Sequence, residues 1–157
     1  MPETQETVLT FKFSIVTPYG VAFTGKVSAI QFESCAGLVE ILPLHEPIIT
    51  TIKIGLIIIS TPIDDVNVKQ TVYAVHGGFL QKVGEEVTVY AMAAESGDAI
   101  DLNRAQEAAQ RARKCLEQMT HNPEEMKLDI DHAHLALLRA IARINAREVN
   151  TELKLKT

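Results

Sequence analysis

The residues best suited to chemistry are arginines in the second half of the chain. Arg139, Arg143 and Arg147 recur every four residues, so on a helix they form one basic stripe. Arg104 and Arg111 lie seven residues apart and would share one face of an earlier helix. Guanidinium groups bind carboxylates and phosphates through bidentate hydrogen bonds. The pattern therefore indicates either a solvated helix face or recognition of an acidic or polyanionic partner.

The histidines are weaker candidates for functional residues. His45 lies between Pro43 and Pro47, which restrict the loop around it, so either a structural or an interface role fits. His132 and His134 are two residues apart and would point to different sides of a helix. They cannot share a metal ion as residues four apart could, and we expect both at the surface.

Motifs for catalysis are missing from the sequence. It contains no GxSxG, HExxH or GxxxxGK[ST] pattern. Gly77 and Gly78 lack the spacing of a phosphate-binding loop, so they predict a tight turn or bulge. Cys35 and Cys115 stand alone without CxxC spacing, as expected of free thiols in a reducing compartment. We expect a protein that is not an enzyme and that holds no metal.

Composition limits the classes further. The chain has 157 residues, of which 46% are hydrophobic, enough for one domain or a small domain with an appendage. A net charge of −5 disfavours a nucleic-acid surface. No apolar run approaches the roughly 20 residues that span a bilayer. Residues 1–10 contain two Glu and no Lys or Arg, unlike a signal peptide.

The composition changes near Gly97, which is the last glycine of the chain. The residues before it are rich in β-branched and aromatic types, and those after it in Ala, Leu, Glu and Arg. This predicts an α+β chain: a flexible N-terminus (1–8), an antiparallel β-sandwich (9–96) and a two-helix antiparallel hairpin (97–157), with helices at about 101–120 and 124–151.

Alternation supports the strands. Leu9, Phe11, Phe13 and Ile15 alternate with polar residues, as in a strand with one buried face. Further runs read as strands at residues 26–33, 48–53, 56–60, 66–76 and 86–94. Many short strands at this spacing are typical of a sandwich or flattened barrel.

One apolar stripe runs along the first predicted helix. Its members follow a 3-4-3-4-3 spacing: Leu102, Ala105, Ala109, Ala112, Leu116 and Met119. Asp101 is a suitable N-cap. Alanines allow close helix packing but bury little apolar area, so we expect a weakly held, mobile hairpin.

Together these segments resemble the epsilon subunit of F-type ATP synthase from about residue 9 to residue 149. The resemblance rests on the order of several pieces: Val16-Thr17-Pro18, residues 37–43 leading to His45 and Pro47, residues 75–80 with Gly77-Gly78, residues 87–91, residues 100–105 and residues 139–143. It implies a sandwich of about ten strands in residues 8–95 and a hairpin that either folds onto it or extends.

The resemblance also implies a role. A non-catalytic rotor subunit of the central stalk would link the gamma subunit to the c-ring, couple proton or sodium flow to ATP synthesis, and inhibit ATP hydrolysis through the extended hairpin. Arg139, Arg143 and Arg147 would then pair with acidic segments of the alpha and beta subunits. His45, Glu40 and Leu42 would contact gamma or the c-ring. The protein would lie peripherally on the cytoplasmic face of a bacterial inner membrane, or on an organellar membrane.

An alternative role is ATP sensing. Ile100-Asp101-x-x-Arg104-Ala105 resembles the motif by which some bacterial members bind ATP in the folded hairpin. The matching positions are Glu95, Ile100, Asp101, Arg104, Ala105, Arg111, Arg139 and Arg143. ATP would be a regulatory ligand here, and no cofactor is required.

Overall fold

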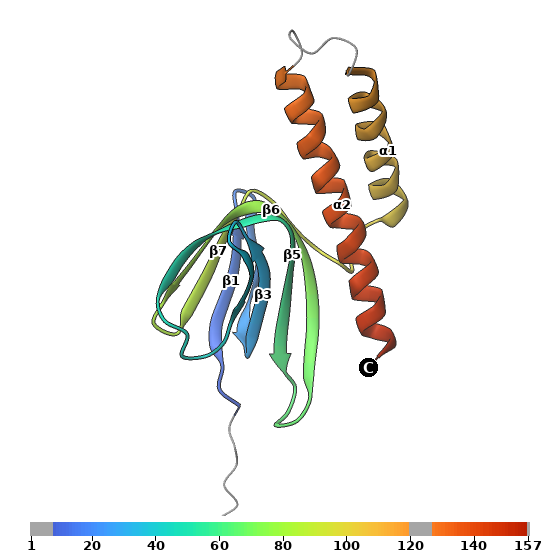
Figure 1. Ribbon diagram of the computed structural model, residues 1–157. Coiled ribbons are helices and arrows are strands. Elements are labelled where there is room, and N and C mark those ends of the chain that lie inside the picture. Colours follow the sequence, from blue (N-terminus) through green and yellow to red (C-terminus); the bar gives the residue numbers. More distant parts are fainter. Residues whose placement is uncertain (1–7, 120–126, 157) are drawn as a thin grey trace, which may run out of the picture.

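The computed structural model describes residues 8–119 and 127–156, in which eight strands precede two helices (Figure 1). The strands are β1 (Phe11–Thr17), β2 (Gly20–Val27), β3 (Ala29–Ser34), β4 (Gly37–Ile41), β5 (Ile48–Pro62), β6 (Val68–Val83), β7 (Glu86–Ala91) and β8 (Ala94–Ser96). The helices are α1 (Leu102–Met119) and α2 (Lys127–Leu155). The predicted α+β order is confirmed. Residues 1–7 of the predicted flexible N-terminus and the predicted start of the second helix at 124 lie outside the described residues.

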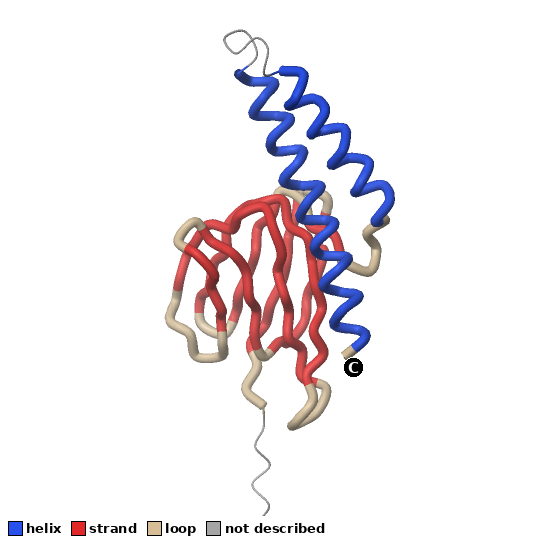
Figure 2. The backbone as a smooth tube through the Cα atoms, turned by 45° about the vertical axis from the view of Figure 1, so that its right-hand side comes forward, coloured by secondary structure: helices blue, strands red, loops and turns tan. Residues whose placement is uncertain are grey.

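The strands form two layers that β5 and β6 join (Figures 1 and 2). One layer has the order β2, β1, β7, then the second half of β6 and the first half of β5. The other contains β4, β3, the second half of β5, the first half of β6 and β8. Because β5 and β6 each continue from one layer into the other, the described residues form eight strands, whereas about ten were expected. Predicted strands 48–53 and 56–60 are both parts of β5.

One strand pair departs from the antiparallel expectation. β1 pairs with β7 in parallel, with Phe13 opposite Val87, whereas the other pairs in the described residues are antiparallel. Strands far apart in sequence can pair in either direction, because no tight turn joins them. Alternation within one strand does not encode this choice.

Gly77 and Gly78 lie where β6 passes between the layers. Their φ angles are 79° and 147°, and the register of β6 on β5 is the same on both sides of Gly77, with Gly78 opposite Ile52 and His76 opposite Ile54. A Cβ on Gly78 would lie 2.0 Å from the carbonyl oxygen of Tyr90. The two glycines thus permit positive φ angles, and Gly78 also permits the close approach of β7. The predicted tight turn or bulge is wrong, because β6 continues through both residues as one strand in an unchanged register.

The sandwich core follows the predicted alternation. Phe11, Phe13 and Ile15 are buried, whereas Leu9 precedes β1 and is 61% exposed, so the buried face starts one pair later than expected. Aromatic contacts tie the layers together: Phe23 packs on Phe13 at a centroid distance of 5.7 Å and on Tyr73 at 5.9 Å.

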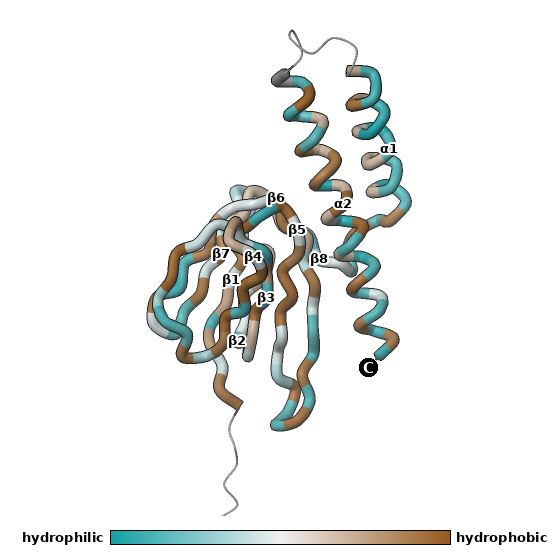
Figure 3. The backbone as a smooth tube through the Cα atoms, in the orientation of Figure 1, coloured by the Kyte–Doolittle hydropathy of each residue, from teal (hydrophilic) through white to brown (hydrophobic). Residues whose placement is uncertain are grey.

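The helices form an antiparallel hairpin beside the sandwich. The C-terminal half of α2 lies along β5 and β6, while its N-terminal half and α1 extend beyond the strands (Figures 1 and 2). Ala105, Ala109 and Ala112 of the predicted stripe are buried. Hydrophilic residues dominate the rest of α1 (Figure 3). Neither described helix is long and apolar enough to cross a membrane.

A second, smaller hydrophobic cluster joins hairpin and sandwich. Its buried members are Val72, Ala74, Ile100, Ala105 and Ala146, two from β6 and three from the linker and helices. The sandwich core is much larger and includes three phenylalanines. Since apolar burial scales with area, the hairpin is held far less strongly than the sandwich holds itself.

Candidate functional site

A pocket of about 420 Å³ lies where the sandwich ends and the hairpin begins. β8 contributes Glu95, the linker contributes Ala99, Ile100 and Asp101, and α2 contributes Arg143. The α1 residues that line it are Arg104, Ala105, Ala108 and Arg111. Small-molecule pockets commonly have volumes of about 300–1,000 Å³, so the size suits a nucleotide-sized ligand.

The structure brings together seven of the eight residues expected at an ATP site. Glu95, Ile100, Asp101, Arg104, Ala105, Arg111 and Arg143 all line this pocket. Arg139 does not line it and is exposed on α2, one turn from Arg143. Ala99 and Ala108 are lining residues that sequence reasoning missed. The 104-108-111 spacing along α1 could have indicated Ala108, but the alanine side chain has no functional group that would mark it as a site residue.

Glu95 and Arg143 connect the two sides of the pocket. Both Nε and Nη2 of Arg143 donate to Oε1 of Glu95, at 2.9 and 2.6 Å. This contact lowers the pKa of the Glu95 carboxyl; burial opposes it, and nearby His76 and Arg104 make smaller contributions that lower the pKa further. Glu95 is therefore ionised at neutral pH and holds α2 against β8. Arg104 and Arg111 leave the pocket with a surplus of positive charge.

Asp101 caps α1. Its Oδ1 accepts a hydrogen bond from the backbone N–H of Arg104 at 3.1 Å, and its carbonyl oxygen accepts one from Ala105 at 3.0 Å. The N-cap prediction is confirmed. The cap fixes where α1 starts and hence the direction in which Arg104 leaves the helix.

A second set of polar contacts continues along α2 below the pocket. Arg147 Nη1 donates to the carbonyl oxygens of Gly97 and Asp98, at 3.2 and 2.9 Å. Asn150 Nδ2 donates to Asp98 Oδ1 at 2.8 Å, and Lys154 forms an ion pair with the same carboxylate. These partners lower the pKa of Asp98. We call Asp98, Arg147, Asn150 and Lys154 the linker clasp.

The clasp was largely missed from the sequence. Arg143, Arg147, Asn150 and Lys154 have 4-3-4 spacing, so they share one helix face, and that periodicity could have extended the arginine stripe. The arginine stripe is thus not simply solvated: two of its three members hold the linker and β8.

The residues expected at a gamma or c-ring interface lie elsewhere. Leu42 and His45 belong to the loop between β4 and β5, and Glu40 lies in β4; none of the three lines the pocket. Glu40 and Leu42 are exposed and His45 is half-buried. Its ring Nδ1 lies 2.8 Å from the carbonyl oxygen of Glu46. Leu44, which lies between Leu42 and His45, adopts φ 66°, a conformation that is strained for leucine.

The other groups singled out from the sequence are dispersed. Within residues 8–119 and 127–156, no three His, Cys, Asp or Glu side chains gather as metal ligands. His132 and His134 are exposed, as predicted. Cys35 and Cys115 are free thiols on different parts of the molecule.

Comparisons with known proteins agree with this architecture. Residues 10–97 match the family model for the β-sandwich domain of the ATP synthase delta/epsilon chain, and residues 98–148 match that for its long α-helix domain. The two matched regions meet at the linker between Gly97 and Asp98.

Curated relatives match most of the chain. The ATP synthase epsilon chain of Desulfitobacterium hafniense strain DCB-2 is 37% identical over 137 residues, covering 87% of this chain and 96% of the relative. The epsilon chain of Bacillus pumilus is 35% identical, with 87% and 95% covered. That of Clostridium botulinum strain Eklund 17B is 36% identical, with 90% and 98% covered.

A solved structure has the same fold. A chain of the Euglena gracilis mitochondrial ATP synthase assembly of OSCP, F1 and c-ring superposes with a TM-score of 0.63 at 17% identity, covering 93% of this chain and 81% of that one. Two consecutive family models and full-length relatives at more than one-third identity support one assignment: the chain belongs to the delta/epsilon family of ATP synthase, as an epsilon subunit of the F-type enzyme.

Proposed function

We propose that this epsilon subunit is a rotor subunit of the central stalk whose sandwich links gamma to the c-ring and whose released hairpin inhibits ATP hydrolysis. The observation that carries the proposal is the way the hairpin is attached. α2 contacts the sandwich through a small, alanine-rich cluster and a row of polar contacts to residues 95–98. Such an interface can dissociate while the larger sandwich core stays folded.

The basic stripe explains what release would achieve. In the folded-down hairpin, Arg143 is bound to Glu95 and Arg147 to linker carbonyls. Once α2 leaves, those guanidinium groups and that of Arg139 become available to carboxylates of the alpha and beta subunits. Charge-assisted pairs of this kind favour a defined docking position. A hairpin docked there would oppose rotation.

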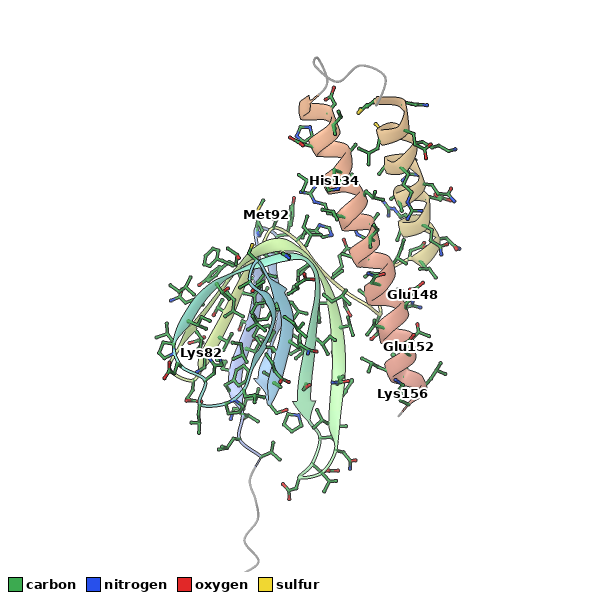
Figure 4. All side chains as sticks on the ribbon, in the orientation of Figure 1. Lys82, Met92, His134, Glu148, Glu152 and Lys156 are labelled. Atoms are coloured by element: carbon green, nitrogen blue, oxygen red, sulfur yellow. The ribbon has the colours of Figure 1, made fainter. Side chains whose placement is uncertain are left out.

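Reconstitution tests the inhibitory role. ATP hydrolysis by the assembled enzyme is measured with the full chain, with a chain lacking residues 101–157, and with Arg139, Arg143 and Arg147 all changed to Gln. We expect both variants to relieve inhibition while assembly is retained. Glu148→Gln with Glu152→Gln is the control, because these side chains are exposed on the same helix (Figure 4). Unchanged hydrolysis in an assembled deletion complex would refute the inhibitory role.

The docking role assigns Glu40, Leu42 and His45 to the contact with gamma or the c-ring, and places the protein at the membrane through the complex. Exposure of Glu40 and Leu42 supports this. By analogy with the bacterial relatives, the location is the cytoplasmic face of the inner membrane. Co-purification with gamma tests it: Leu42→Asp should weaken retention, whereas Val66→Asp, at an exposed residue near the β5–β6 turn, should not.

A second role, ATP sensing, is supported by the pocket. Arg104, Arg111 and Arg143 supply guanidinium groups for phosphates, and Ile100 with Ala105 supplies an apolar wall for a base. A carboxylate or backbone carbonyl can accept the adenine amino group. ATP bound there would contact α1, α2 and β8 together and so stabilise the folded-down hairpin.

Calorimetry of the full chain with MgATP tests this role. Heat and thermal stabilisation at millimolar MgATP are expected, and Arg111→Ala should weaken both. Arg113→Ala is the matched control because Arg113 is exposed on the same helix but does not line the pocket. If the wild-type chain shows neither heat nor stabilisation, the sensing role is wrong.

A further inference from the structure

His76 occupies an unusual position beneath the attachment of the hairpin. It lies in β6, is only 9% exposed, and its backbone N–H donates to the carbonyl oxygen of Ala93 at 3.0 Å. Its ring Nε2 is fully buried and has no hydrogen-bond partner among the described residues. A buried polar atom without a partner costs free energy, and charging the same ring would cost more.

The charges around His76 come mainly from the hairpin. Arg143 and Arg139 face it from α2, and Glu95, the partner of Arg143, faces it from β8. Arg104 of α1 acts on the same Glu95. On β5, the residue opposite His76 is the uncharged Ile54. The next β5 residue, Lys53, is paired with Glu33 of β3 at 3.1 Å.

These surroundings favour the neutral ring. Burial lowers the pKa of His76 below its ordinary value of 6.5, and repulsion by Arg143 lowers it further. Glu95 opposes this with an effect smaller than that of Arg143, and Arg139 adds the smallest lowering effect. Two of these influences, both arginines, belong to α2. They leave together with the helix when the hairpin leaves the sandwich.

We propose that His76 makes the attachment of the hairpin sensitive to pH, so that protonation of its imidazole releases α2 from the sandwich. The inference rests on the proposed function, since it assumes a hairpin that can leave. Nothing else in the interface needs to change, because Arg143 and Arg139 already lie near enough to act on the ring electrostatically and would repel a charged imidazole.

The sign follows from linkage. The folded-down form has the lower His76 pKa, and the released form regains a value near the ordinary 6.5 because the ring becomes hydrated and loses both arginines. The released form therefore binds the proton more tightly. Above pH 6.5 the attachment is complete; it weakens as the pH falls below 6.5 and the loss levels off below the lowered pKa. Each unit of difference between the two pKa values changes the closed-to-released ratio tenfold.

The two native thiols provide the measurement. Cys35 lies in the turn between β3 and β4 and Cys115 on α1, so spin labels on both report the distance between sandwich and hairpin in the full chain. The distance distribution is recorded from pH 7.5 to 5.0, above the range in which Glu95 titrates. We expect the folded-down population to fall severalfold in the wild-type chain and to stay constant in His76→Gln.

His134→Gln is the matched control. His134 is exposed on the half of α2 that extends beyond the sandwich (Figure 4), so this variant should show the wild-type pH dependence. Arg139→Gln removes one repelling charge without altering a buried residue, and should reduce the pH dependence even if His76→Gln folds poorly. In the full chain with the hairpin folded down, the NMR resonance of the His76 imidazole should titrate with a pKa below 6.5.

The outcomes distinguish the His76 proposal from the mobile hairpin of the proposed function. If the labels show release but its pH dependence is absent, or is equal in wild type and His76→Gln, the His76 proposal is overturned while the mobile hairpin stands. If the distance stays fixed under every condition, including with gamma present, both the proposal and the mobile hairpin of the proposed function are wrong.

Discussion

Changing Gly97 to alanine should release the hairpin without harming the sandwich. Gly97 is buried between β8 and α2, and its N–H donates to the carbonyl oxygen of Val72 at 2.8 Å. A Cβ at this position would lie 2.9 Å from both the carbonyl oxygen of Ala146 and the Cβ of Asn150. Both contacts are about 0.5 Å shorter than the 3.4 Å at which ordinary van der Waals contact begins.

The steric strain in Gly97→Ala should be relieved by movement of α2, which is held less strongly than the sandwich. Gly97 does not occupy the left-handed region, so an alanine fits its backbone conformation and the effect is steric. One obstructing atom belongs to the α2 backbone and cannot rotate away. Overpacking of this kind costs about 1–3 kcal/mol. Because the clasp and the small second cluster hold α2, that cost should shift the closed-to-released ratio by roughly 5- to 150-fold.

The label pair on Cys35 and Cys115 measures this shift at pH 7.5, with far-ultraviolet circular dichroism and thermal unfolding to follow the sandwich. Gly55→Ala is the control, since Gly55 lies in β5 next to the hairpin but a Cβ there meets no atom within 4 Å. An unchanged distance distribution in a folded Gly97→Ala chain would refute the view that close approach of the linker and α2 keeps the hairpin down.

Further outcomes follow from the same contacts. A double-mutant cycle of Glu95→Gln and Arg143→Gln should give a coupling of about 1 kcal/mol in hairpin closure, measured by the same label distance. Since the pKa of Glu95 is lowered by Arg143, its contribution is complete above pH 4.5 and disappears as the pH falls through the lowered value; closure measured below pH 4.5 should show this second loss in His76→Gln. Asp101→Ala should cost α1 about 1 kcal/mol and speed hydrogen exchange in its first turn, leaving the sandwich amides unchanged. Gly78→Ala should lower the unfolding midpoint of the sandwich sharply, because its Cβ would meet the carbonyl oxygen of β7 at 2.0 Å.

Much of the fold is encoded locally and could be predicted. The alternation of Phe11, Phe13 and Ile15 marks a strand with one buried face, and the alanine stripe of α1 marks a helix against another helix. Asp101 before Leu102 marks the helix start. These patterns depend on neighbours within one or two turns, so the linear sequence carries them in full.

What the sequence left open depends on pairing across the molecule. The parallel partner of β1 and the continuity of β5 and β6 through both layers follow from how distant strands meet, which periodicity within one segment does not record. The sequence predicted a tight turn or bulge at Gly77 and Gly78, but only the structure shows that their backbones have positive φ angles and that the close approach of β7 excludes a side chain at Gly78.

The site divides in the same way. The residues that match the family's ATP-binding motif include seven lining residues of the pocket, and helix geometry alone places Arg104 and Arg111 on one face. The sequence by itself determined which groups could bind an anion. Only the tertiary structure decided that Arg143 is held by Glu95, that Arg147, Asn150 and Lys154 grip the linker, and that His76 lies buried beneath them. The physical reason is that charge, hydration and pKa depend on distances between residues some 20 to 70 positions apart in the chain, and folding alone sets those distances.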